Sequence, residues 1–517
     1  MEGPRTILED QIEGSGNPPT QARSLQSIQD RVQLAVCSIA LAVSISIWFF
    51  AIRAPLWLDE TISFWQINAG FWRISSRQGL SFPAYSYILW LWTKATGTGE
   101  ITLRISSILA MLGAVYLLYR AARELFDRDV AIIAAVVFCL HPVVISASID
   151  VRPYAFGALA ITSSILALVH LRHNTSNWLA ALFGLSAACI VYFQLLFVVI
   201  LPALAICFLA LIAGDRKTLW RRLGVALVAF GLAFLPVIPN VQYMFHTSGT
   251  HVFSEAPVLL DLAQTFTTRR LEYILFYTVL AAAATRRLDL RSHLKIWPIL
   301  LCTTLALVPI LILYGVSVRT SLHIFVFRYR LVAVPGVALC WALVISRIDS
   351  RALRLLFCMA IVTATAYHDF TSPYSKRHGF YTWKYALETV EKNASMDDAP
   401  VLICSDFPES DYMPMPVGSA VKDSNIFAPL TYYKLNVPVV PLPRALNDEA
   451  VRIGSQFLQE AAQRHQRFLA LAFQPSYRTL EWIANNASGT DYIRELGVFD
   501  GIKVLEFVPR TQADASR

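Results

Sequence analysis

Charged residues are scarce in this 517-residue sequence: Asp, Glu, Lys and Arg make up 15% of it, whereas 56% is hydrophobic. Its mean hydropathy is +0.50. No soluble protein of this length needs so much apolar surface, so the composition excludes a soluble protein and predicts a polytopic membrane protein. The net charge of +8 does not indicate nucleic-acid binding, because the basic residues cluster in short loops between apolar runs, a pattern of membrane orientation.

Other features are absent as well. The eight cysteines include no CxxC pair and lie almost all in apolar segments, which excludes a disulfide framework and indicates small buried side chains. The C-terminal region lacks GxGxxG and phosphate-loop motifs, so nothing there indicates a nucleotide site. No cleavage site of small residues follows the first apolar run, which we therefore expect to be a retained helix.

Eleven apolar segments are candidates for membrane helices. They cover residues 33–52, 102–119, 129–148, 155–171, 177–194, 195–213, 223–239, 271–285, 296–316, 331–346 and 352–368. A twelfth segment, 82–97, is rich in aromatic residues and is interrupted by Lys94. If this segment lies along the membrane surface, every short basic loop falls on the cytoplasmic side, as the Lys/Arg bias requires. We therefore expect 82–97 to be an interfacial helix on the outer side.

With this orientation in the inner (plasma) membrane, the chain is predicted to have three regions. Residues 1–30 are polar and are expected to form a disordered cytoplasmic extension. Residues 31–370 form a mostly α, polytopic helical bundle whose first outer loop is 53–101. Residues 371–517 form an extracytoplasmic α/β domain, because strand-like apolar runs alternate with helical patterns, which suggests a small parallel or mixed sheet. The expected strands are 401–404, 437–442, 468–473 and 502–508, and the expected helices are 383–393, 448–464 and 477–486.

Two adjacent carboxylates, Asp59 and Glu60, come directly after the first apolar segment and are framed by tryptophans, which suit a membrane interface. One interpretation is that they cap an interfacial helix; the other is that they carry chemistry.

The Lys/Arg bias places most basic residues on the cytoplasmic side, so arginines in the outer loops are unusual. Two of these loops contain a carboxylate as well as an arginine, and a third loop, later in the chain, contains two further arginines. Arg53 precedes Asp59, Arg152 follows Asp150, and Arg319 and Arg328 lie in a later loop. An arginine near the outer headgroups binds phosphate in a bidentate manner. The alternative is that each arginine extends along the interface or binds ordinary phospholipid headgroups.

Six segments, in this order, resemble motifs of the GT-C glycosyltransferases, the group that contains protein O-mannosyltransferases and aminoarabinose lipid A transferases. The chain resembles in particular the subgroup typified by rhizobial lipopolysaccharide glycosyltransferases. The segments are Trp57-Leu58-Asp59-Glu60, Phe82-Pro83-Ala84-Tyr85-Ser86-Tyr87, Thr102-Leu103-Arg104-Ile105-Ser106-Ser107, Leu125-Phe126-Asp127-Arg128, His141-Pro142 with Asp150-Val151-Arg152-Pro153-Tyr154-Ala155, and Phe327-Arg328-Tyr329 with Pro335. The chain departs from the usual pattern with Phe82 for a proline and Asp150 for a glutamate.

The resemblance implies a GT-C-like bundle of about eleven transmembrane helices and an enzyme that takes a sugar from a polyprenyl-phosphate donor. Asp59 would be the general base toward the acceptor hydroxyl, and Glu60 would raise its basicity or orient Asp59 or the acceptor. With one base and no second nucleophile, we expect direct displacement with inversion. The residues expected to bind the donor phosphate are Arg152, Arg328, Arg53 and Arg319. Those expected to contact substrate are Asp150, Tyr154, Tyr85, Tyr329 and His323.

The acceptor expected from the sequence is a glycan, a lipid or a protein, and the C-terminal domain has either a structural or an acceptor-recognition role. Oligosaccharyl transferases of similar architecture use a divalent metal, but the outer loops show no counterpart of their DxD motif, so we expect no catalytic metal and no cofactor.

One alternative to a glycosyltransferase is a transporter or flippase of envelope lipids or glycans, although we find no internal repeat and the charges lie at span ends. The other is a non-catalytic envelope assembly protein.

Overall fold

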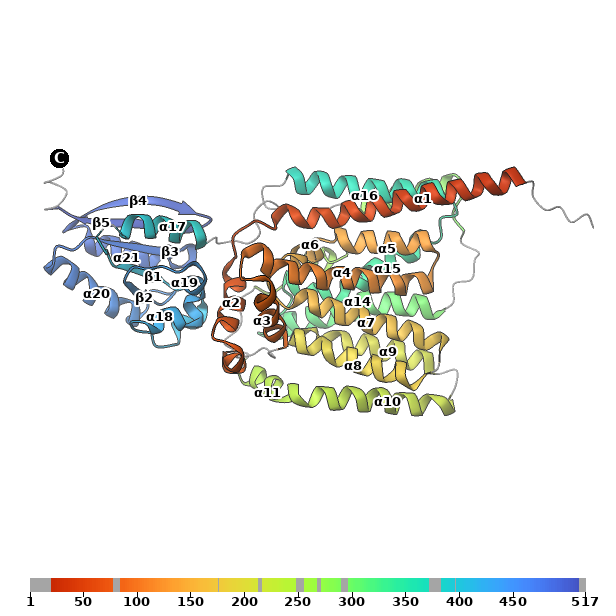
Figure 1. Ribbon diagram of the computed structural model, residues 1–517, viewed down its shortest axis with the longest axis horizontal. Helices are drawn as coiled ribbons and strands as arrows, with labels where there is room; N and C mark the ends of the chain where they lie inside the picture. The colour runs from red at the N-terminus through yellow and green to blue at the C-terminus, as the bar shows by residue number, and fades with distance from the viewer. Residues whose placement is uncertain are drawn as a thin grey trace, which may run out of the picture.

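The computed structural model describes residues 20–77, 84–174, 176–212, 216–247, 255–266, 271–289, 296–371, 383–395 and 397–510. A helical bundle and a sheet domain follow one another along the long axis of the molecule (Figure 1). All eleven predicted apolar segments are helical. Within the described residues, seven helices are long and apolar enough to cross a membrane, one further candidate is a bent helix pair, and three apolar helices are shorter.

The long candidates are formed by α1 (Thr20–Ile47), α4 (Glu100–Leu125), α7 (Tyr154–His173), α10 (Arg216–Phe234) with the 3-10 helix η5 (Leu235–Val237) and the start of α11 (Ile238–Thr247), α14 (Ile296–Arg319), α15 (Val334–Ile345) with the 3-10 helix η7 (Phe327–Ala333), and α16 (Arg351–Thr371). The shorter ones are α8 (Asn177–Phe193), η4 (Leu195–Ile200) with α9 (Leu201–Ile212), and α13 (Leu271–Ala284). Two small helices, α11 (Ile238–Thr247) and α12 (Leu259–Ala263), follow α10. The first helix begins at Thr20, within the region 1–30 predicted to be an extension, and residues 1–19 lie outside the described residues.

The bent pair consists of α5 (Arg128–Leu140) and α6 (Pro142–Ser148), which meet at an angle of 70°. Pro142 explains the bend, because a proline disfavours the helical conformation of the residue before it. His141 is accordingly extended, and its imidazole accepts a hydrogen bond from the backbone of Val143 at 3.3 Å, which caps α6. The bend ends this span near the loop that carries Asp150.

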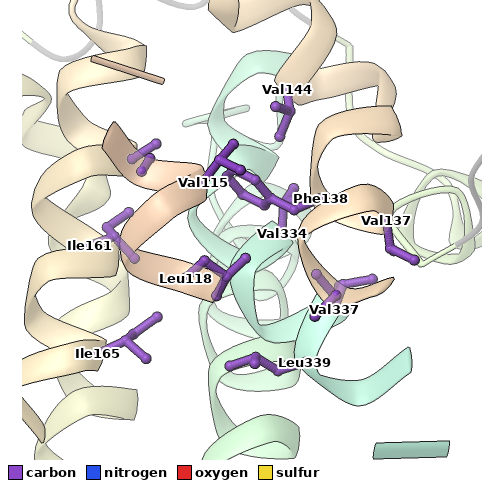
Figure 2. Packing of buried hydrophobic residues seen from close by; sticks show 14 of the residues in the cluster. Val115, Leu118, Val137, Phe138, Val144, Ile161, Ile165, Val334, Val337 and Leu339 are labelled. Carbon is purple, nitrogen blue, oxygen red and sulfur yellow. The ribbon is translucent and has the colours of Figure 1, made fainter. Parts of the chain in front are cut away.

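The centre of the bundle is formed by α4, α5, α7 and α15. Every residue of α5 from Val130 to Leu140 is buried. Figure 2 shows Leu118, Phe138, Ile161 and Val337 among the side chains that pack there. A helix that is apolar and buried on all sides lies inside a bundle, and such helices are held together chiefly by close packing.

Gly336 of α15 shows how close this packing is, because a Cβ at this position would overlap the backbone of α14 at Leu305 and Ala306. We expect Gly336→Ala to lower the melting temperature of the purified protein in detergent, since backbone atoms cannot rotate away and overpacking costs about 1–3 kcal/mol. Gly315→Ala is the matched control on α14, where a new Cβ meets nothing within 4 Å. Equal melting temperatures for the two variants would contradict this account.

Short helices cover the end of the bundle next to the sheet domain. α2 (Leu58–Asn68) and α3 (Ala84–Thr96) run across the ends of the long helices, and α1 begins at the opposite end of the bundle (Figure 1). This position of α3 agrees with an interfacial helix, although Phe82 and Pro83 lie outside the described residues. Which end faces the cytoplasm stays a prediction.

The C-terminal domain contains a mixed five-stranded sheet in the order β2-β1-β3-β5-β4. Its strands are β1 (Val401–Cys404), β2 (Val439–Leu442), β3 (Phe468–Phe473), β4 (Asp491–Phe499) and β5 (Ile502–Pro509). β1 pairs in parallel with β2 and β3, whereas β5 is antiparallel to β3 and β4. The four predicted strands are present. β4 was not predicted, because it is an edge strand whose residues are mostly exposed and lack an apolar pattern.

Helices cover both faces of this sheet. α17 (Trp383–Ala394), α18 (Ala420–Asp423) and α19 (Ala428–Tyr433) contribute to one buried cluster, whereas α20 (Asp448–Gln463) and α21 (Tyr477–Ala487) contribute to the other. Along β1, Ile403 belongs to the first cluster and Leu402 to the second, as the alternation of a strand requires. α19 also contacts α2, so this face of the domain rests on the end of the bundle.

Candidate active site

A buried ion pair holds the segment that leads into α2. Arg104 of α4 has no exposed surface and donates to both carboxylate oxygens of Glu60, from Nε to Oε1 at 3.1 Å and from Nη2 to Oε2 at 2.7 Å. The remaining N–H groups of the guanidinium donate to the carbonyl oxygens of Ile52 (3.0 Å), Ala54 and Pro55 (3.0 Å). All five N–H groups of this arginine are therefore used.

Glu60 is equally well satisfied. Besides Arg104, its carboxylate accepts hydrogen bonds from the backbone N–H of Trp57 at 3.1 Å and from that of Val151 at 2.9 Å. Glu60 thus ties together the segment before α2, the helix α4 and the loop that holds Asp150. These contacts support an orienting role for Glu60, and its predicted part in catalysis stays a prediction.

The same segment is also held from the side of the sheet domain. The hydroxyl of Tyr433 at the end of α19 accepts a hydrogen bond from the backbone N–H of Leu56 at 2.7 Å. It also lies 3.3 Å from the carboxylate of Glu100, and Lys384 of α17 approaches Glu100 to 3.5 Å. The segment before Asp59 is therefore held by hydrogen bonds from both the bundle and the sheet domain.

Asp59 is the second residue of α2, where the helix dipole favours a carboxylate. Its side chain is 18% exposed, and its Oδ2 accepts from Nη1 of Arg328 at 2.5 Å. Arg152 donates from Nη1 to the backbone carbonyl of Asp59 at 3.1 Å. Both guanidinium groups have a buried Nε with no hydrogen-bond partner among the described residues. The structure thus brings together three residues of the predicted site, Asp59, Arg152 and Arg328.

Asp150 lies beside this group. Its Oδ1 accepts from the indole N–H of Trp57 at 3.0 Å, and its backbone carbonyl accepts from the hydroxyl of Ser107 at 2.7 Å. Burial raises the pKa of the Asp150 carboxyl to about 7, and the negative charge of Glu60 acts in the same direction. Around neutral pH this carboxyl is therefore able to donate or to accept a proton.

Aromatic side chains also lie at this candidate site. The guanidinium of Arg328 lies 5.9 Å from the ring centre of Trp57 and 5.6 Å from that of Tyr329. The rings of Tyr329 and Tyr154 are 6.4 Å apart. Tyr85 of α3 is buried against Phe156, with 5.5 Å between ring centres, and its hydroxyl has no hydrogen-bond partner among the described residues.

Three predicted residues lie apart from this group in the contacts that the structure describes. Arg53 is exposed, Arg319 is exposed at the end of α14, and His323 is half-buried between α14 and η7. No described hydrogen bond or ion pair joins them to Asp59, and their predicted roles stay predictions.

The described part of the chain contains no group of three or more His, Cys, Asp and Glu side chains that could hold a metal ion. The absence of a catalytic metal from the reaction stays a prediction.

Residues 81–243, from α3 to α11, match the family model described as dolichyl-phosphate-mannose-protein mannosyltransferase. The structure is similar to that of ArnT from Cupriavidus metallidurans bound to undecaprenyl phosphate. The TM-score is 0.54 at 10% sequence identity, and the match covers 91% of this chain and 97% of ArnT. This chain has a GT-C fold.

A further GT-C structure, the oligosaccharyltransferase AglB from Archaeoglobus fulgidus in complex with an inhibitory peptide and a dolichol-phosphate, matches with a TM-score of 0.47. The identity is 12%, and the match covers 94% of this chain and 75% of AglB. Among curated proteins, none matches the sequence. As the fold class predicted, the helical bundle of this chain is followed by a C-terminal α/β domain.

Sequence reasoning placed Arg104 in a motif but did not assign it to the site. The available signal was a charged residue near the start of an apolar span, which usually has a partner and a function. Trp57 and Ser107 also lie in these motifs but were not assigned to the site, because aromatic and hydroxyl groups are common in helices and at membrane interfaces. Tyr433 left no signal in the sequence.

Proposed function

We propose that this protein is a glycosyltransferase that moves a sugar from a polyprenyl-phosphate donor to an acceptor hydroxyl, with Asp59 as the general base. One observation carries the proposal: the guanidinium of Arg328 pairs with the partly exposed Asp59 carboxylate, that of Arg152 binds the Asp59 backbone carbonyl, and both keep an N–H group without an acceptor among the described residues. Buried donors without partners are costly, and an anionic phosphate would satisfy them with charge-assisted hydrogen bonds.

In the proposed reaction the acceptor oxygen attacks the anomeric carbon while Asp59 takes the hydroxyl proton. The bond from the anomeric carbon to the phosphate oxygen breaks, and its electron pair leaves with the polyprenyl phosphate. Arg152 and Arg328 stabilise the charge that develops on this oxygen. A single displacement by one nucleophile inverts the anomeric configuration.

The similarities support a lipid-phosphate donor. The ArnT structure of similar fold contains undecaprenyl phosphate, and the family model that matches residues 81–243 is described by a dolichyl-phosphate-mannose donor. We place the reaction on the periplasmic face, because α2, the helix that contains Asp59, lies at the opposite end of the bundle from the start of α1 (Figure 1), and the basic loops predict a cytoplasmic N-terminus.

The function is tested with the purified full-length protein in lipid nanodiscs. Polyprenyl-phosphate sugars extracted from the source membranes serve as donors, and oligosaccharides released from the source envelope serve as acceptors. We expect transfer with a new linkage of inverted configuration, read by NMR. Movement of lipid-linked sugars across sealed vesicles without transfer would favour the flippase alternative, and binding without either activity would favour an assembly protein.

Arg152→Ala and Arg328→Ala are each expected to weaken the binding of undecaprenyl phosphate by about tenfold or more, because each removes charge-assisted hydrogen bonds of about 1.5–3 kcal/mol. Binding is measured by titration of the nanodisc-embedded protein. Arg73→Ala, at an exposed arginine of the first outer loop, is the control and should bind normally. Full affinity in both site variants would refute the phosphate site.

A further inference from the structure

The order of the strands in the C-terminal sheet places a switch point between two neighbouring strands, where the chain leaves them toward opposite faces. β1 and β3 are adjacent and parallel. The chain leaves β1 toward α18 and α19 on one face, and it leaves β3 toward α21 on the other face. In open α/β sheets, ligands bind beyond the carboxyl ends of two such strands, because the connections diverge there and leave space between them.

Polar groups with unused hydrogen-bonding capacity lie at this edge. Asp406, two residues after β1, is 5% exposed, and its one hydrogen bond among the described residues comes from the indole N–H of Trp383 at a long 3.4 Å. Ser476, three residues after β3, is the last residue of the 3-10 helix η10 (Gln474–Ser476). It is fully buried, and its hydroxyl has no partner among the described residues. Arg444, two residues after β2, is half-buried.

Asp59 lies next to the domain that carries this edge. Leu58 and Ile62 of α2 pack against the buried cluster that contains Trp383 and Phe407. Asp59 is the neighbour of Leu58 in the chain, and Asp406 is the neighbour of Phe407.

Electrostatics agree with this placement. Burial raises the pKa of the Asp406 carboxyl to about 7, the positive charge of Arg444 opposes this, and the negative charge of Asp59 adds to it.

We infer that the carboxyl edge of the C-terminal sheet binds the acceptor, that Asp406 and Ser476 hold it, and that the acceptor is a carbohydrate. This inference rests on the proposed function, because it supplies the substrate whose hydroxyl Asp59 deprotonates. Asp406 accepts hydrogen bonds from neighbouring hydroxyls of a sugar ring, and Ser476 both donates and accepts, which matches the mixed hydrogen bonding of a polyol. The next hydroxyl of the bound sugar would then point toward Asp59.

A peptide acceptor fits this edge less well. An extended peptide binds by adding a strand to an open sheet edge. β1 is paired on both sides, with β2 and β3, and β3 is paired with β1 and β5. The carboxyl ends of β1 and β3 therefore offer side-chain hydrogen bonds rather than free backbone groups.

The test compares Asp406→Asn and Ser476→Ala with the wild-type full-length protein in nanodiscs. Donor and acceptor preparations are those of the transfer assay, and initial rates are measured against the concentration of envelope oligosaccharides. We expect the KM for oligosaccharide to rise about tenfold in Asp406→Asn, which corresponds to about 1.4 kcal/mol, and to rise less in Ser476→Ala. The KM for the donor should not change. Asp448→Asn, an exposed carboxylate at the start of α20, is the matched control and should retain the wild-type KM.

Direct binding separates this inference from the proposed function. Saturation-transfer NMR with the same oligosaccharides should show binding to the wild type and to Asp59→Asn, and weaker binding to Asp406→Asn. If the wild type binds oligosaccharides but transfers no sugar, the proposed function fails, whereas the inferred carbohydrate site is supported. If Asp406→Asn and Ser476→Ala both match Asp448→Asn in KM and in binding, or if the transferred sugar appears only on peptides of an envelope protein digest, the inference is overturned.

Discussion

Asp59→Asn is expected to lower the rate of sugar transfer by about 10²–10⁴-fold, the usual contribution of a general base. Asparagine keeps the shape of the side chain and still accepts a hydrogen bond from Arg328, but it takes up no proton near neutral pH. The affinity for undecaprenyl phosphate should therefore stay near the wild-type value. The measurement is single-turnover transfer with donor and acceptor both saturating, so that only the chemical step is compared.

The matched control for this variant is Asp423→Asn. Asp423 lies at the same junction between the bundle and the sheet domain, its side chain is 77% exposed, and it approaches Arg77 only to 3.6 Å. This control should transfer sugar at the wild-type rate. An unchanged rate in Asp59→Asn would remove Asp59 from the role of base, whatever the outcome for the arginines.

The second large effect is expected at the buried pair of Arg104 and Glu60. Arg104→Ala leaves the Glu60 carboxylate and three carbonyl oxygens without their donor, and breaking a buried ion pair costs about 3–5 kcal/mol. Much of this variant is expected not to fold. Arg104→Lys is more informative, because an ammonium group with three donors cannot replace all five N–H groups.

For Arg104→Lys we expect a lower kcat with an unchanged KM for the donor, since the segment before α2 shifts and misplaces Asp59. The double variant Glu60→Gln/Arg104→Leu separates placement from stability. Removing both charges costs less stability than removing one, so the melting temperature should recover relative to Arg104→Ala while kcat stays low.

Arg120→Ala, at an arginine on the same helix that contacts Tyr116, is the control for the Arg104 variants. It should leave kcat unchanged. If kcat recovers together with the melting temperature in the double variant, the pair acts on stability alone and does not place Asp59.

α2 explains why the two domains are expected to act together. Glu60 ties the start of this helix to the bundle, whereas Leu58 packs against the core of the sheet domain. Asp59, between them, is therefore positioned by both domains at once. A change in the sheet domain at Tyr433, which binds the backbone of Leu56, would reach the carboxylate through the same short segment.

Many local features were readable in the sequence because they depend on stretches of a few to about twenty residues. The eleven apolar segments are helical since their composition leaves no other way to satisfy the backbone in a membrane. The bend between α5 and α6 follows from the proline at 142, although the sequence analysis did not use it. Four strands were recognised by buried apolar runs, and β4 was not, because an exposed edge strand carries no such run.

The assembly of the site was decided by the tertiary structure. Arg53, Arg152, Arg319 and Arg328 have the same chemistry and similar surroundings in the sequence, yet in the described contacts only Arg152 and Arg328 reach Asp59. The partner of Glu60 comes from another helix, and Arg328 lies 269 residues from Asp59 along the chain. Hydropathy determines that a segment crosses the membrane, but the rotation of a helix about its axis and its choice of neighbours depend on side-chain packing across the whole bundle. The sequence by itself thus determined the membrane helices, the α/β domain and the candidate residues, and only the packing of the helices decided which of those residues meet.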